Sequence, residues 1–133
     1  MKILTRDQIL KVQDIKTEEV LIPEWGEGVG VLVRGLEGVG RDIFEESVVE
    51  QTGKKTKIKM RNARARLVSM SVVDEKGNLI FSEADVEAIG HKNAAALDRI
   101  YEVASRLAGI SDEDMEELVK NSEAIQSEGS ISG

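Results

Sequence analysis

Two glycines separated by four residues are the first feature of the sequence that could perform chemistry. Gly35 and Gly40 follow an apolar, valine-rich stretch and precede a stretch with helical spacing, which is the context of a phosphate-binding P-loop. A P-loop also needs a lysine and a hydroxyl, but the next two residues are Arg41 and Asp42, whose carboxylate would repel phosphates. We therefore expect the glycines to supply positive φ in a tight strand-to-helix connection. A degenerate P-loop-like nucleotide-binding enzyme is kept only as an alternative.

Residues suited to metal binding or nucleophilic catalysis are scarce. The chain has no cysteine, which excludes disulfides and thiolate sites, and its single histidine, His91, excludes any site that needs two. The acidic residues between 112 and 117 lack the alternating oxygen ligands and central glycine of a calcium loop, and acids are favoured at a helix start in any case. We expect no catalytic residue, no metal site and no cofactor.

Several arginines and one tryptophan are candidate contacts to a partner. Arg34 and Arg41 flank the glycine turn, where they could form either structural ion pairs with nearby acids or a positive lip. Trp25 lies in a loop and is either packed on its own hairpin or exposed as an anchor for a partner. Three more arginines could form a basic helix face or a solvated one. The candidate partner-binding residues are Trp25, Arg34, Arg41, Arg61, Arg64 and Arg66.

The charge of the chain is negative overall and unevenly spread. The net charge of −7 argues against nucleic acid as the main partner. Basic residues cluster in the stretch 54–66, while from Ser111 onward seven acids face one lysine. This asymmetry could steer a partner or support weak self-association. A nucleic-acid-associated phage or bacterial regulator that uses residues 54–66 remains an alternative, although no aromatic residue interleaves the basic ones for base stacking.

Length and hydropathy favour one soluble domain. A chain of 133 residues can bury one real core, and we expect a globular domain over 1–121 followed by a flexible polar tail over 122–133. No apolar run approaches the roughly 18 to 20 residues of a membrane span, and the N-terminus lacks the apolar core of a signal peptide. We expect a cytosolic protein without membrane contact.

Local patterns predict mostly helices and one hairpin. Thr5 and Gln8 form a capping box for a short helix that should end near Asp14. Strands are expected over 19–22 and 29–34, with Pro23 ending the first. Further helices are expected over about 41–51, 60–73, 82–90 and 93–108 and from Ser111, with a polar, mobile linker over 52–56 and a turn over 74–78. The predicted fold class is α+β: a mainly α-helical single domain with a small antiparallel β-hairpin near the N-terminus.

The order of short motifs along the chain resembles a known family. Each motif is common by itself, but together, in this order, the motifs cover about residues 3–125. The motifs are Leu4 to Leu10, Val20 with Pro23 to Gly26, Val31 to Leu36, Arg41-Asp42 with Phe44-Glu45, Ala65 to Val68, Asp74 and Gly77 leading to Phe81-Ser82 and Asp85-Val86, and Ala96-Leu97 with Ile100 leading to Leu107 and Gly109-Ile110. This order is similar to that of the tail assembly chaperones of long-tailed, non-contractile bacteriophages and prophages.

The resemblance implies an assembly factor without catalysis, acting in the cytoplasm of the bacterial host cell. Such proteins bind the tape-measure protein, keep it soluble and promote polymerisation of the major tail protein around it, and they are absent from the finished virion. Many exist in a short form and a longer, frameshifted form. By this resemblance the expected partners are the tape-measure protein and the major tail protein.

Overall fold

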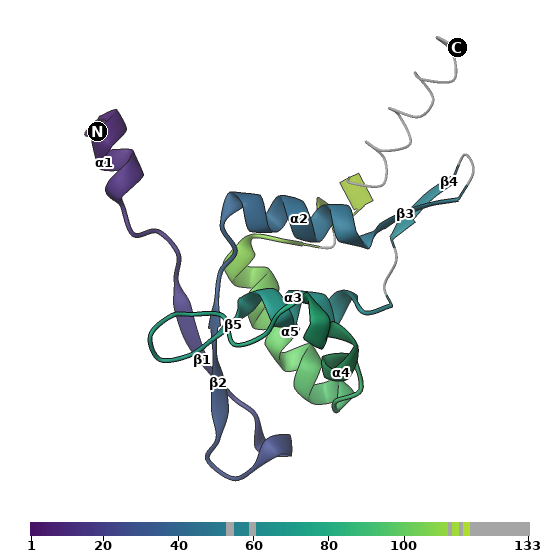
Figure 1. Ribbon diagram of the computed structural model, residues 1–133. Coiled ribbons are helices and arrows are strands. Elements are labelled where there is room, and N and C mark those ends of the chain that lie inside the picture. Colours follow the sequence, from purple (N-terminus) through teal and green to yellow (C-terminus); the bar gives the residue numbers. More distant parts are fainter. Residues whose placement is uncertain (53–54, 59–60, 112, 115, 118–133) are drawn as a thin grey trace.

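The computed structural model describes residues 1–52, 55–58, 61–111, 113–114 and 116–117. Its elements in chain order are α1 (Arg6–Lys11), β1 (Thr17–Leu21), the 3-10 helix η1 (Pro23–Trp25), β2 (Gly30–Arg34), α2 (Gly38–Val48), β3 (Val49–Thr52), β4 (Lys55–Ile58), α3 (Ala63–Ser71), β5 (Val72–Val73), the 3-10 helix η2 (Glu83–Asp85), α4 (Val86–Gly90) and α5 (Ala94–Ala108). The fold is α+β, as predicted, with helices packed beside a small antiparallel sheet (Figure 1). Among the described residues, none of the helices combines the length and apolar composition needed to cross a membrane.

The predicted N-terminal hairpin is present, and a third strand extends it. β1 pairs antiparallel with β2, so that Val20 lies opposite Val31. On its other side β2 pairs with β5, which places Val33 opposite Val72 and gives the strand order β1-β2-β5. The third strand matters because a two-stranded hairpin alone is marginally stable in water.

Two predicted helices end earlier than expected because strands replace their C-terminal ends. The helix expected to reach residue 51 ends at Val48, and β3 pairs with β4 in a second hairpin. The expected mobile linker over 52–56 was therefore wrong for Thr52, Lys55 and Thr56, which lie in strands. The helix expected to reach residue 73 ends at Ser71, because the two following valines join the sheet. β-branched residues favour strands when a partner strand is in reach.

The elements with strong local caps form where the sequence predicts them. The Thr5 hydroxyl accepts from the Gln8 amide at 3.3 Å, which starts α1, although α1 ends at Lys11 rather than near Asp14. The Asn93 side chain accepts from the backbone amide of Ala96 at 3.0 Å and starts α5. Gly109 ends α5 with a φ of 71°. Capping depends on a few adjacent residues, so it can be predicted without knowledge of the tertiary fold.

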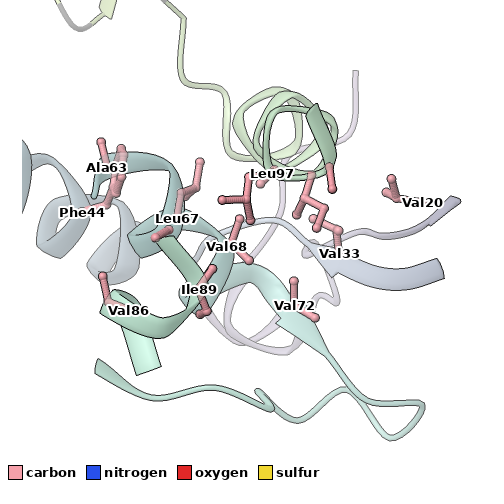
Figure 2. Close-up of a cluster of buried hydrophobic side chains, with 14 of the residues drawn as sticks. Val20, Val33, Phe44, Ala63, Leu67, Val68, Val72, Val86, Ile89 and Leu97 are labelled. Atoms are coloured by element: carbon pink, nitrogen blue, oxygen red, sulfur yellow. The ribbon is translucent and has the colours of Figure 1, made fainter. Parts of the chain in front are cut away.

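The core lies where α5 crosses α3 and the sheet. Ile100 and Ala104 on α5 are fully buried, as expected for the central helix. Figure 2 shows Leu67 and Val68 of α3 between Leu97 of α5 and Ile89 of α4. α3 is packed on several sides at once, which explains why its buried residues do not form a single stripe.

The structure describes only part of the C-terminal region, for which a last helix and a polar tail were predicted. Residues 113–114 and 116–117 are helical, and Ser111 and Asp114 form reciprocal side chain-to-backbone hydrogen bonds of 3.1 and 2.9 Å at the start of that turn. The remainder of the expected last helix, the boundary at 121/122 and the expected tail over 122–133 lie outside the described residues.

Candidate functional site

Trp25 lies in an apolar pocket at the tip of the β1–β2 hairpin. The pocket has a volume of about 340 Å³. Its walls come from the sheet, α3, α4 and α5 and include Val31, Val68, Phe81, Ala88 and Ile100. Trp25 itself remains 41% exposed, so its ring both lines the pocket and faces solvent. We call this cavity the Trp25 pocket; its charged lining residues are Asp85 and Lys92.

An ion pair holds the pocket's tryptophan against the helical layer. Arg99 on α5 makes two hydrogen bonds to the Glu24 carboxylate, one of them 2.8 Å between Nη2 and Oε2. The bond from Arg99 lowers the pKa of Glu24 below its ordinary value of 4.5, and the same bond raises the pKa of Arg99. Because Glu24 precedes Trp25 within η1, this pair links the short helix that carries the tryptophan to α5.

A second surface lies on the opposite face of the sheet. Val20, Val31 and Val33 point toward α5, and side chains alternate along a strand, so Leu21, Leu32 and Val73 point away from it. There they border an open groove of about 650 Å³, whose lining also includes Val20, Val31 and Val72 of the same strands. Of the described residues that line this groove, the charged ones are all acidic: Glu19, Asp74 and Glu75. We call it the outer groove.

The glycine segment that suggested a P-loop does not form a phosphate-binding loop. Gly38 and Gly40 already belong to α2, and the N-cap residue is Glu37, an acid whose side chain makes no capping hydrogen bond. The expectation of positive φ was also wrong, because the positive-φ glycines among the described residues are Gly26, Gly28, Gly77 and Gly109. Gly35 instead permits a close approach, since a Cβ atom there would lie 3.0 Å from the backbone oxygen of Leu107. Close packing against α5 explains this glycine.

Arg41 is part of a structural network. Its Nε donates to Glu45 at 2.8 Å, one helical turn along α2, and its Nη1 donates to the backbone oxygen of Gly109 at 3.3 Å. Asp114 lies 3.7 Å from the guanidinium. The bond to Glu45 raises the pKa of Arg41, while the Ser111 backbone amide and hydroxyl, followed by Arg41, lower the pKa of Asp114. These contacts show that Arg41 forms structural ion pairs, which was one of its two interpretations, and not a positive lip at the glycine turn.

The other candidate arginines do not gather at one site. Arg64 pairs with Asp98 on α5 at 2.5 Å, and Arg66 pairs with Glu83 on η2. Arg61 is exposed just before α3. Arg34, at the end of β2, is half-buried, and its Nε has no hydrogen-bond partner among the residues that the structure describes. Residues 55–58 of the basic stretch form β4, but the side chains of residues 54–60 lie outside the described part.

The sequence analysis did not single out Glu24 or Arg99, which position the candidate anchor. A usable signal was present in α5, where Arg99 and Arg106 lie seven residues apart and therefore on one side of the helix. Arg106 contacts Glu18 on β1 with two hydrogen bonds of 2.9 and 2.7 Å. Two arginines on one side of an amphipathic helix suggest acidic partners on the adjoining layer.

Comparison with known proteins was made at three levels: curated proteins, solved structures and family models. No curated protein and no solved structure is significantly similar to it. A family model described as phage tail assembly chaperone matches residues 5–121, which includes both surfaces and nearly all of the described residues. The resemblance noted in the sequence is thereby confirmed, and the chain belongs to the phage tail assembly chaperone family.

Proposed function

We propose that this chain is a non-catalytic assembly chaperone that binds the tape-measure protein through the Trp25 pocket. It keeps the client soluble in the cytoplasm of the host cell while the major tail protein polymerises around that client, and it is absent from the mature virion. The observation that carries the binding role is the pocket itself: a preformed apolar cavity of about 340 Å³ with a 41% exposed tryptophan.

The shape and chemistry of the pocket suit a helical client. An amphipathic helix binds by placing apolar side chains of one face into an apolar groove, and a partly exposed aromatic residue is a frequent anchor in such contacts. Asp85 and Lys92 line the same pocket and offer one charge of each sign to polar residues of the client helix. The Glu24–Arg99 pair holds the anchor in place before the client arrives, which lowers the entropic cost of binding.

Co-expression with a tape-measure protein from the same genome tests this function. We expect the wild-type chain to raise the soluble yield of the client and to co-purify with it. Ala88→Asp introduces a charge into the pocket at an exposed position of α4, so it should abolish co-purification without unfolding the chain. Trp25→Ala should weaken co-purification in the same direction.

Val39→Asp serves as the matched control, because Val39 is an exposed apolar residue on α2 that does not line the pocket. It should leave co-purification unchanged. A client that stays insoluble with the wild-type chain, or that binds Ala88→Asp as well as wild type, would contradict the proposal.

A further inference from the structure

The N-terminal residues 1–16, which we call the arm, expose apolar side chains along most of their length and meet the rest of the described chain at their end, where the backbone oxygen of Lys16 accepts from the Gly35 amide at 2.9 Å. α1 buries none of its residues, and six large apolar side chains of the arm are between 41% and 72% exposed. They are Ile3, Leu4, Ile9, Leu10, Val12 and Ile15. A helix of six residues is far below the length at which isolated helices are stable in water, so α1 needs a surface to pack against.

The outer groove has the properties that such an arm requires. Leu21 and Val29 border it and are 60% and 43% exposed. The groove therefore exposes apolar surface, as the arm does. The arm carries four basic and two acidic side chains in a chain of net charge −7, whereas the charged residues that line the groove are all acidic. Apolar contact and charge complementarity therefore point to the same pairing.

The direction of the arm favours the groove of another molecule. The arm leaves β1 at Thr17, at the opposite end of the strand from Leu21. In Figure 1 α1 lies beyond that end, away from the hairpin tip and from the loop that follows β5. To reach its own groove, the chain would have to reverse direction within residues 12–16.

We propose that the arm of one copy of this chain packs into the outer groove of a second copy. The exchange is reciprocal in a twofold dimer, so each favourable contact occurs twice. This self-association goes beyond the proposed function. Val31, Val72 and Ile80 border both cavities, but Leu21 and Val29 line the outer groove and not the Trp25 pocket, so the two roles can be tested at different residues.

Mixing two defective variants provides the main test. Leu10→Asp disables the arm and Leu21→Asp disables the groove; both sites are at least 60% exposed in the single chain, so folding should be retained. Each variant alone should raise the dissociation constant of the dimer by about a hundredfold, measured by sedimentation equilibrium. An equimolar mixture should recover association as a heterodimer, because one intact arm then meets one intact groove. Val39→Asp, on α2, should associate like wild type.

The absence of cysteine permits a direct check of proximity. Leu10→Cys and Leu21→Cys, placed in separate chains that carry tags of different mass, should be joined by a short bifunctional maleimide into a covalent heterodimer. A chain with both substitutions that is cross-linked only within itself would show that the arm covers its own groove, and this result would overturn the proposal.

Two further outcomes would overturn it. One is a wild-type chain that remains monomeric up to about 100 µM, where exchange of two apolar arms should produce association. The other is a dimer that Leu10→Asp does not weaken. The proposed function is judged separately: Ala88→Asp should lose the client and keep self-association, while Leu21→Asp should lose self-association and keep the client.

Discussion

Alanine should change the stability of the protein in opposite directions at Gly35 and at Gly38. A Cβ atom at Gly35 would lie 3.0 Å from the backbone oxygen of Leu107 and 3.4 Å from its carbonyl carbon. The backbone of α5 cannot rotate away as a flexible side chain would, so the end of β2 must move. Overpacking of this kind destabilises a protein by about 1–3 kcal/mol. Gly38 has no atom within 4 Å of its Cβ position and lies in the first turn of α2, where alanine should stabilise by about 0.4–1 kcal/mol.

The difference between the two variants is the quantity to measure. Urea denaturation followed by far-ultraviolet circular dichroism should separate Gly35→Ala from Gly38→Ala by about 1.4–4 kcal/mol in the free energy of unfolding. The comparison cancels much of the uncertainty in each value, because both changes add the same methyl group. If both variants lose the same stability, the glycines serve a common backbone conformation and the explanation by close packing is wrong.

Three other predictions concern α5 and the hairpin tip. Ile100→Ala should lower the free energy of unfolding by about 2–5 kcal/mol in the same urea assay, because Ile100 is fully buried; a loss below about 1 kcal/mol would place it outside the core. Gly109→Ala should lower it by about 1 kcal/mol, because the φ of 71° is unfavourable for a residue with a Cβ atom, and an unchanged stability would contradict this. The Glu24–Arg99 pair has a lowered carboxylate pKa, so its contribution is complete above pH 4.5 and is lost as the pH falls through the lowered value. The fluorescence of Trp25, the only tryptophan, should report that transition, and Arg99→Gln should remove it.

Features that depend on neighbouring residues could be predicted from the sequence. The capping side chains of Thr5 and Asn93 and the glycine that ends α5 act within one helical turn. The β1–β2 hairpin was predictable for a similar reason, since two apolar stretches flank a loop that begins with the single proline.

Features that depend on residues far away in the sequence could not be predicted in this way. β5 is only two residues long, and nothing in Val72–Val73 distinguishes a helix end from a strand until β2 lies beside it. The sequence also offered six candidate contacts without showing which were already engaged. Arg64 and Arg66 find their acids 34 and 17 residues away, so only the fold reveals those ion pairs. Trp25 was expected in a loop and instead ends the short 3-10 helix η1, and its pocket is assembled from elements throughout the chain.

The two arginines of α5 also bear on how β1 and β2 avoid slipping past each other. β2 places apolar residues on both faces at Val31, Leu32 and Val33, so its own pattern tolerates a shift of one residue, whereas in β1 such a shift would turn the buried Val20 outward and Glu19 inward. Such a shift would turn Glu18 to the outer face and separate it from Arg106. We infer that the burial of Val20 and this ion pair together select the alignment of the hairpin. The chain can thus keep an apolar outer face available for binding and still fold to one strand alignment.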